Sequence, residues 1–528
     1  MEIQKNGIER YDRIIIITVL AASVLRILFY LFMDVDINCD EAMLSINANS
    51  IANTGKDIYG TSFPVYFEAW SYGGQSALPT YLCALFIRVF GNGIKIVRLP
   101  FVLISCLSIF FFYKLNRLLF NKREALIALV LLTICPWHIV QQMIALDCNM
   151  FPHVFIFGLY FLVKGMKNKS NINIYISMII LALTLYCYGV AIFFVPVFLL
   201  VIGIKEICNK SIRVSTFLIS ILVFTVAALP ILLFYFINFL GIKDLSLGIV
   251  SIHKMIYQNR SSDLLFFSKY IDLQLGYNTI CLLKTLVLQK DYCIWNYVPW
   301  FGTIYIVSGI FVLLGLIKRN NDTERVNRSF YLVIWFAISF VLGLIIDDTN
   351  INRLNIIWYV MIILCARGIE SVIDKFGKKA RGGIQVLYSV LFVAFICCFI
   401  ATYSDNVNNA AVFSRGYSKA LKQVYDEDEV YISMDVCSSS DMLVYSYNEF
   451  GNDKEYHFDR KLMAYRDFAH RTDVFDFNDR ITGVEIFEGM VLDKDTYIIG
   501  ENELDKIGNI SDFDIKEYGE YRVLKRFN

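Results

Sequence analysis

"IIIITVLAASVLRILFYLFMDVDINCDEAMLSINANSI" (residues 14–51) joins a long apolar run to a group of acidic side chains. Residues 14–33 are almost all apolar, and a helix of about 20 apolar residues crosses a hydrocarbon core of about 30 Å. Four carboxylates follow within eight residues: Asp34, Asp36, Asp40 and Glu41. Asp34 and Asp36 are interpreted as the solvated flank of the span. Asp40 and Glu41 are predicted to open a second helix, where acidic residues are favoured.

The composition predicts a membrane protein. The 528-residue chain is 57% hydrophobic, with a mean hydropathy of +0.53, whereas a soluble globular chain is usually about 45–50% apolar. Its net charge of +1 gives no indication of a nucleic-acid or acidic partner. The 13 cysteines lie mostly in apolar runs and are interpreted as small buried thiols. Charged residues are concentrated after Tyr403, so we expect a polytopic helical module followed by a soluble tail.

Apolar runs of spanning length recur along the first 403 residues. We count eleven, near residues 14–33, 97–118, 124–143, 151–166, 172–188, 190–204, 213–238, 300–317, 329–346, 355–370 and 384–403. Alternate loops, such as "NKRE" and "DKFGKKARGG", are rich in Lys and Arg, as is the segment before the first run. Basic loops favour the cytoplasmic side, which predicts a cytoplasmic N-terminus. The shorter apolar segment 77–91 is predicted to be an amphipathic helix on the outer surface.

This topology divides the chain into two domains. Residues 1–403 form the predicted transmembrane module, with a first extracytoplasmic loop at 34–96 and a long one at 239–299. In residues 404–528, strand-like pieces such as "EVYISM" and "YRVLKRF" alternate with helical ones such as "DMLVYSYNEF". The tail is therefore predicted to be a small extracytoplasmic α/β domain.

Polar residues that could carry chemistry gather at the outer ends of the predicted spans. The sequence has no G-x-x-x-x-G-K-[ST], H-E-x-x-H or G-x-S-x-G motif, which disfavours ATP-driven transport and metalloproteolysis. The residues predicted at one level of the membrane are Asp40, Glu41, Gln75, Arg98, Asp147, Asn149, His153 and Arg353. Carboxylates and arginines from distant segments at one depth predict a site better than any one of them does.

The order of these motifs resembles the GT-C glycosyltransferases. The motifs are Asp-Glu after the first span, "YGGQSALP", "VRLP", "CPWHIV" with "ALDCN", and "NINRLNIIW". Over the first 370 residues they are similar, more narrowly, to the branch of protein O-mannosyltransferases and aminoarabinose transferases. The resemblance implies a sugar donor on polyprenyl phosphate, an active site at the outer membrane face and an extracytoplasmic acceptor. It maps the family's acidic residues onto Asp40 and Asp147. Gln75 lies near the sequence position at which the aminoarabinose transferases carry a lysine.

The chemistry of such a transfer assigns roles to these residues. The reaction needs a base for the acceptor's proton and hydrogen-bond donors for the departing phosphate. We expect Asp40 to be the base of an inverting displacement, with Glu41 beside it and Asp147 orienting the acceptor. Residues expected at the donor phosphate are Arg98, Arg353, Arg260, Gln75 and Tyr72. Residues expected near the acceptor are Asn149, His138 and His253. No cofactor is required, and a divalent metal held by Asp40 and Asp147 is left open.

Other interpretations stand beside these roles. Asp40 could be a helix cap, Arg98 and Arg353 could reach lipid headgroups, and His138 could be a packed residue. The rival class is a transporter or flippase of a lipid-linked sugar, which would typically show interrupted helices and polar residues near the midplane. Arg26 lies within the first span, where a charge predicts a polar neighbour on another helix. The Ile-, Asn- and Lys-rich composition is typical of a bacterial source.

Overall fold

The computed structural model describes residues 2–69, 73–255, 264–318, 323–408, 413, 416–433, 475–478 and 481–527. The chain divides into two compact units. The first comprises Met1–Met33, Pro100–Phe236 and Asn259–Tyr403, and the second comprises Asp34–Leu99, Ile237–Gln258 and Ser404–Asn528. Each unit is therefore assembled from segments that are far apart in the sequence.

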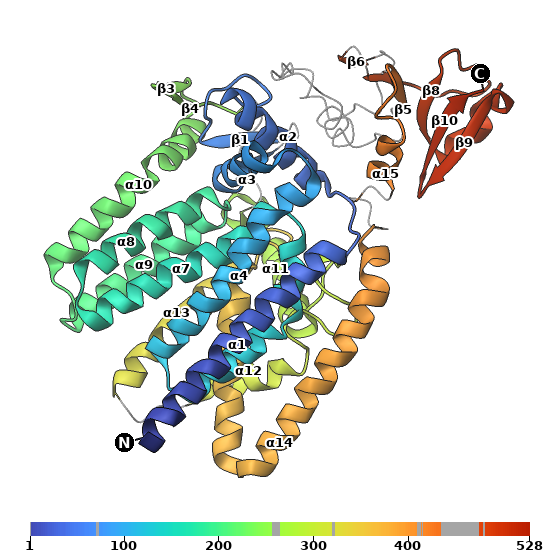
Figure 1. Cartoon of the computed structure of the whole chain (residues 1–528). Coiled ribbons are helices and arrows are strands. Elements are labelled where there is room, and N and C mark those ends of the chain that lie inside the picture. The colour runs from blue at the N-terminus through green and yellow to red at the C-terminus, as the bar shows by residue number, and fades with distance from the viewer. Residues whose placement is uncertain are drawn as a thin grey trace. The chain divides into compact units, whose positions relative to one another are not determined.

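Helices dominate the first unit (Figure 1). Its helices, three of which continue into the second unit, are α1 (Glu2–Phe32), α4 (Ile94–Leu119), α5 (Lys122–Thr133), α6 (Pro136–Val140), α7 (Asp147–Asn168), α8 (Asn171–Leu183), α9 (Ala191–Cys208), α10 (Val214–Leu240), α11 (Ile271–Leu283), α12 (Ser308–Ile317), α13 (Thr323–Ile345) and α14 (Ile357–Asn408). On α10, Leu218, Leu222, Val226 and Leu229 are exposed at helical spacing. An exposed apolar stripe on a long helix is typical of a surface that faces lipid.

Each of the eleven predicted runs contains a helix or part of one, but run 124–143 covers the bent pair α5 and α6, and only Ser308–Ile317 of run 300–317 is α-helical. Among the described residues, six helices are long and apolar enough to cross a membrane. The pair Lys122–Thr133 and Pro136–Met143, bent by 53°, makes seven if it counts as one span. The last two predicted runs lie on α14, which Figure 1 shows turning back on itself. Its backbone breaks at Gly377, whose φ of 71° favours glycine. The chain is thus a multi-pass membrane protein, and the count of eleven stays a prediction.

Close helix contacts in the first unit depend on small residues. A Cβ added to Gly315 on α12 would lie 1.9 Å from the carbonyl oxygen of Leu364. A Cβ added to Gly368 on α14 would lie equally close, at 1.9 Å, to the carbonyl oxygen of Phe311. The two backbones therefore touch, as is common where helices pack inside a membrane.

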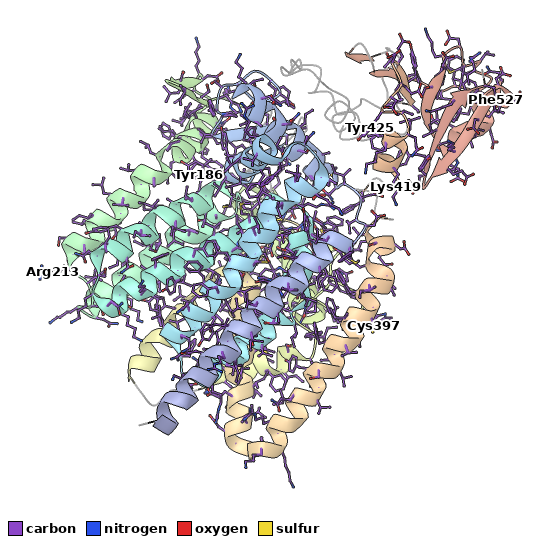
Figure 2. All side chains as sticks on the ribbon, viewed as in Figure 1. Tyr186, Arg213, Cys397, Lys419, Tyr425 and Phe527 are labelled. Carbon is purple, nitrogen blue, oxygen red and sulfur yellow. The ribbon has the colours of Figure 1, made fainter. Side chains whose placement is uncertain are left out.

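The 12 described cysteines, including exposed Cys397 (Figure 2), form no disulfide.

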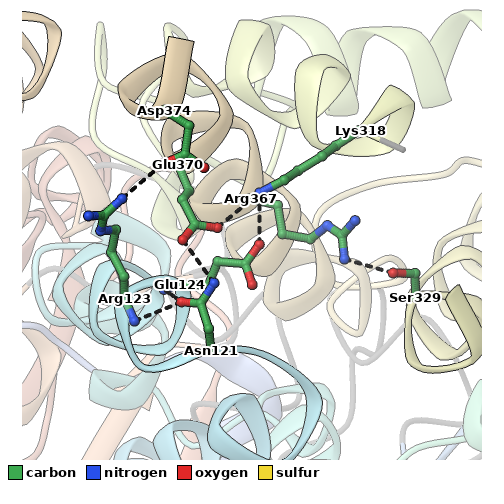
Figure 3. Close-up of polar contacts among 8 residues, drawn as sticks. All are labelled: Asn121, Arg123, Glu124, Lys318, Ser329, Arg367, Glu370 and Asp374. Atoms are coloured by element: carbon green, nitrogen blue, oxygen red, sulfur yellow. Dashed lines mark hydrogen bonds and ion pairs between the residues drawn. The ribbon is translucent and has the colours of Figure 1, made fainter. Parts of the chain in front are cut away.

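A buried polar cluster joins three helices of the first unit (Figure 3). Lys318 Nζ lies 3.0 Å from Glu124 Oε1 and 2.9 Å from Glu370 Oε2, and Asn121 Nδ2 donates to Glu370 Oε1 at 2.9 Å. These residues come from the start of α5, the end of α12 and the part of α14 before its break at Gly377. They lie at loops that are predicted to be cytoplasmic, so the cluster fixes that end of the helices rather than the predicted site.

The second unit combines a first-loop subdomain with the tail. Its elements are α2 (Cys39–Thr54), β1 (Tyr66–Ala69), β2 (Gly73–Ser76), α3 (Ala77–Phe90), β3 (Leu245–Leu247), β4 (Val250–Ile252), α15 (Tyr417–Lys422), β5 (Val430–Ser433), β6 (Phe475–Asn478), β7 (Ile481–Val484), β8 (Thr496–Gly500), β9 (Phe513–Tyr518) and β10 (Tyr521–Arg526). The tail contains a six-stranded mixed sheet in the order β6-β7-β5-β8-β10-β9. This sheet confirms the strands predicted in the tail, whereas the predicted helical piece "DMLVYSYNEF" lies outside the described residues. The short helix predicted at 77–91 is present as α3.

The division cuts the chain after Tyr403, where the domain boundary was predicted, but it also places Asp34–Leu99 and Ile237–Gln258 in the unit of the tail. Ala42, Met43 and Ile46 of α2 belong to the same buried apolar cluster as Leu421 of α15 and Ile498 of β8. The first loop and the tail therefore contribute side chains to one buried core. The sequence predicted both segments but not their shared core.

Candidate active site around Asp40

A capping box begins α2 at the acidic pair. The N–H of Asp40 donates to Asn38 Oδ1 at 2.9 Å, and the N–H of Asn38 donates to Glu41 Oε2 at 3.0 Å. Asn38 has extended backbone, with φ −83° and ψ 151°, as an N-cap residue requires. The pattern Asn-x-x-Glu satisfies two backbone donors at once. The helix therefore starts at a fixed residue, and Asp40 lies in its first turn.

Glu41 forms a buried ion pair with Arg98. Arg98 Nε and Nη2 lie 2.8 and 2.7 Å from the two oxygens of the Glu41 carboxylate. The guanidinium also donates to the carbonyl oxygens of Val35 and Asp36, at 2.8 and 2.9 Å. Glu41 is fully buried and Arg98 is 6% exposed. The pair ties the chain before α2 to the start of α4, which gives both residues a structural role. Their predicted roles in catalysis and phosphate binding stay predictions.

Hydrogen bonds hold the backbone of Asp40, and its side chain is exposed. Its carbonyl oxygen accepts a hydrogen bond from Gln75 Nε2 at 2.6 Å. Its side chain is exposed, in contrast to that of Glu41. Gln75 is buried on β2 and pairs in register with Phe67 of β1. Of the two adjacent acids, Asp40 is therefore the one that a substrate can reach.

The two earlier acids have different surroundings. Asp34 is exposed, as predicted, and forms a 2.7 Å ion pair with Lys419 of α15, labelled in Figure 2. This hydrogen bond raises the pKa of Lys419. Asp36 was predicted to be solvated, and that prediction is wrong. It is 7% exposed, and its Oδ2 accepts the backbone N–H of Gly416 at 2.7 Å, because the tail folds over it.

A second group of polar residues surrounds the start of α7, in the first unit. Asp147 is the first residue of α7 and is partly exposed. The loop before it is fixed by Asn355, whose Nδ2 lies 2.5 Å from Gln141 Oε1 and 3.1 Å from Asn149 Oδ1. Trp137 Nε1 donates to Asn355 Oδ1 at 2.6 Å. The buried amide of Asn149 thus supports the loop that carries Asp147, whereas its predicted place near the acceptor stays a prediction.

Arg26 has the polar neighbour that its position predicted. It is fully buried, and its Nε donates to His138 Nδ1 at 2.8 Å. Its other nitrogens donate to the carbonyl oxygens of Leu132, at 2.8 Å, and Thr133, at 3.2 Å. These carbonyls belong to the last turn of α5, where the helix dipole favours a cation. Arg26 therefore stabilises the end of α5, at the bend between α5 and α6.

His138 is a packed residue in a polar chain. Its Nε2 lies 3.1 Å from the hydroxyl of Tyr359, which in turn lies 2.7 Å from His153 Nδ1 and 2.7 Å from Ser108 Oγ. His138, His153 and Tyr359 are all buried. These contacts account for both histidines within the first unit and favour the packed interpretation of His138.

The remaining predicted residues have separate surroundings. Arg353 is partly buried and donates to the carbonyl oxygen of Asp347. His253 is buried directly after β4, and its carbonyl oxygen accepts from Asn238 Nδ2 at 3.3 Å. Arg260 and Tyr72 lie outside the described residues.

In the same unit as Arg353, burial raises the pKa of Asp291 to about 6, although two backbone N–H groups oppose the shift.

The part of the chain that the structure describes contains no group of three or more His, Cys, Asp or Glu side chains that could hold a metal ion. The divalent metal that the sequence left open therefore stays untested. Two supporting residues were missed by the sequence reasoning, Asn38 and Asn355. The Asn-x-x-Glu pattern was available for Asn38. Asn355 lies within the quoted motif "NINRLNIIW", but the motif did not indicate its role, because it acts on a loop more than 200 residues away.

Comparisons with known proteins agree with this architecture. Residues 75–234 match the sequence model of the family described as dolichyl-phosphate-mannose-protein mannosyltransferase. The solved structure of ArnT from Cupriavidus metallidurans bound to undecaprenyl phosphate is similar, with a TM-score of 0.56 and 11% identity over 96% of this chain and 97% of that one. No curated protein matches in sequence.

A second solved structure is the archaeal oligosaccharyltransferase AglB from Archaeoglobus fulgidus, in complex with an inhibitory peptide and a dolichol-phosphate. It has a TM-score of 0.50 and 13% identity over 83% of this chain. This chain spans 64% of the length of AglB. The matched family is described as a mannosyltransferase and AglB as an oligosaccharyltransferase, so both are sugar-transferring enzymes. The chain has the fold of the GT-C glycosyltransferases, and the resemblance predicted from its sequence is confirmed at the level of that superfamily.

Proposed function

We propose that this protein transfers one sugar from a polyprenyl-phosphate donor to an extracytoplasmic acceptor, with Asp40 as the general base. The observation that carries the proposal is the difference between two adjacent carboxylates. Glu41 is buried and paired with Arg98, whereas Asp40 is exposed and fixed through its backbone. A carboxylate that is held in place and can be reached by substrate is what a general base requires. The GT-C fold supplies the class of reaction.

The proposed reaction is a single displacement. An acceptor hydroxyl or amine attacks the anomeric carbon as Asp40 takes its proton. The bond between that carbon and the phosphate oxygen breaks, and polyprenyl phosphate leaves with the electron pair. Attack from the face opposite to the phosphate inverts the anomeric centre. The departing phosphate needs cationic or N–H donors. Arg353 and Arg260 keep their proposed place there, while Arg98 already has a carboxylate partner.

The proposed partners follow from this reaction. The donor is a sugar on a polyprenyl phosphate, as the lipid phosphates bound to ArnT and AglB suggest for the class. The acceptor is a component of the cell envelope, and Asp147 is proposed to orient it. We also propose a cytoplasmic N-terminus, with the first loop and the tail on the outer side. The tail would then act where the acceptor is found.

Transfer assays test the proposal on the full-length protein in lipid nanodiscs. The assay supplies radiolabelled undecaprenyl-phosphate mannose, galactose, arabinose and aminoarabinose, each with peptide and glycolipid acceptors. We expect one donor to be consumed by the wild type and transfer to fall by about 10²- to 10⁴-fold in Asp40→Asn. Asp34→Asn is the matched control, because Asp34 is an exposed acid of the same segment whose ion pair lies on the surface.

Two results would count against the proposal. Normal transfer by Asp40→Asn would remove Asp40 as the base. No transfer by the wild type, together with movement of labelled donor across proteoliposome membranes, would instead support the flippase.

A further inference from the structure

The side-chain amide of Gln75 is only half satisfied. Its Nε2 donates to the carbonyl oxygen of Asp40 at 2.6 Å. Its Oε1 is buried and has no hydrogen-bond partner among the residues that the structure describes. The residue as a whole is 6% exposed. A buried amide oxygen without a partner costs about 1–3 kcal/mol, and such groups in folded proteins usually meet water or a ligand.

The orientation of this amide is fixed by its partner. A backbone carbonyl oxygen only accepts hydrogen bonds, so the amide must present its NH₂ group to Asp40. Oε1 is bonded to the same carbon as Nε2 and therefore lies beside the start of α2. The unsatisfied acceptor therefore lies close to the backbone carbonyl of Asp40, in the first turn of α2.

The strand that carries Gln75 is paired and closely packed at this point. Gln75 pairs in register with the fully buried Phe67. The preceding residue, Gly74, lies under the ring of Tyr66, where an added Cβ would come within 2.2 Å of Tyr66 Cε1. The hydroxyl of Tyr66 also donates to the carbonyl oxygen of Gly74 at 3.1 Å. Glycine is therefore required at position 74, because the ring of Tyr66, which Tyr66→Phe would keep, leaves no room for a Cβ there.

We propose that Gln75 is a positioning residue with two separable parts. Its Nε2 fixes the backbone of Asp40, and its Oε1 accepts a hydrogen bond from a hydroxyl or N–H group of the bound substrate. This inference rests on the proposed function. It replaces the contact with the donor phosphate that was expected for Gln75 by a contact with a hydroxyl or N–H group. A neutral amide oxygen repels phosphate oxygens, which carry no proton to donate, but it pairs with the hydroxyls of a sugar or of an acceptor.

Three substitutions separate the two parts. Gln75→Lys keeps an N–H donor for the Asp40 carbonyl and removes the acceptor. Gln75→Glu keeps an acceptor and removes the donor. Gln75→Met removes both at similar size. Tyr66→Phe is the matched control, because it deletes another hydrogen bond of the same hairpin without touching Asp40.

Steady-state kinetics in nanodiscs, with the undecaprenyl-phosphate sugar that the donor assay selects, give the first readout. We expect Gln75→Met to lower kcat by about 10- to 100-fold, since a misplaced reacting group costs that much. Gln75→Lys should restore most of the kcat that Gln75→Met loses, and it should raise the KM for either the donor or the acceptor about tenfold above that of the wild type. Gln75→Glu should instead keep both KM values close to those of the wild type and leave kcat low. A higher KM for the donor assigns the hydroxyl to the sugar, and a higher KM for the acceptor assigns it to the acceptor. Wild-type kcat and KM in Gln75→Met would overturn the inference.

Hydrogen exchange of the first turn of α2 gives a readout that does not need activity. We expect faster amide exchange around residues 39–44 in Gln75→Met, and exchange close to that of the wild type in Gln75→Lys and Tyr66→Phe. Unchanged exchange in Gln75→Met would overturn the positioning part. If the wild type transfers no sugar, the proposed function fails, while this measurement still decides whether Gln75 holds Asp40.

Discussion

The buried ion pair between Glu41 and Arg98 gives a quantitative prediction for Arg98→Met. The substitution leaves the Glu41 carboxylate fully buried without a counter-charge, and breaking a buried pair in this way costs about 3–5 kcal/mol. It also removes the donors that satisfy the carbonyl oxygens of Val35 and Asp36. We therefore expect the free energy of unfolding to fall by at least about 3 kcal/mol.

The assay is titration of the purified protein with SDS in mixed micelles, followed by circular dichroism. In the double variant Glu41→Gln/Arg98→Met the unpaired charge is gone, so about 1–3 kcal/mol of the loss should be recovered. Arg123→Met is the matched control, because its ion pair with Asp374 is more than half exposed and should contribute under about 1 kcal/mol. An Arg98→Met variant as stable as Arg123→Met, or strictly additive effects in the cycle, would refute the reasoning.

Three further predictions concern the first unit. Asn355→Leu should lower transfer while leaving the protein folded, because it frees the loop that carries Asp147; unchanged transfer would show that the loop holds its shape without the amide. Arg26→Leu should cost about 3 kcal/mol of unfolding free energy, because the last carbonyls of α5 lose a charged donor; Arg26→Lys should cost less, and equal losses would contradict the capping role. Asp291, whose pKa is about 6 instead of 3.8, binds its proton more tightly in the folded protein. Its contribution to stability is therefore present below about pH 4 and is lost as the pH rises to about 6, by up to roughly 3 kcal/mol. Melting temperatures of the wild type and Asp291→Asn from pH 4 to 7 should diverge over that window, and parallel curves would contradict the shift.

The sequence predicted the features that follow from local patterns. Apolar length located the helical runs, and strand-like pieces in the tail predicted strands that the structure places in one sheet. The acidic pair at 40–41 was predicted at the start of a helix, and the structure shows a capping box there. These successes depend on interactions within a few residues of one another.

The sequence did not predict features that depend on distant partners. Asp36 was expected in solvent, but Gly416, which lies 380 residues later, donates to its carboxylate. The partners of Arg26 are the last carbonyls of α5, which are available only because the helix ends at a bend. The difference between Asp40 and Glu41 could not be read from two adjacent acids either. It arises from Arg98 on one side and Gln75 on the other.

The most direct test of the account is the single-turnover rate of sugar transfer by Asp40→Asn, measured beside Asp34→Asn with saturating donor in the same nanodiscs. The account predicts a rate about 10²- to 10⁴-fold below that of the wild type for Asp40→Asn and a wild-type rate for Asp34→Asn. Equal, near-wild-type rates in the two variants would contradict the assignment of Asp40 as the catalytic base.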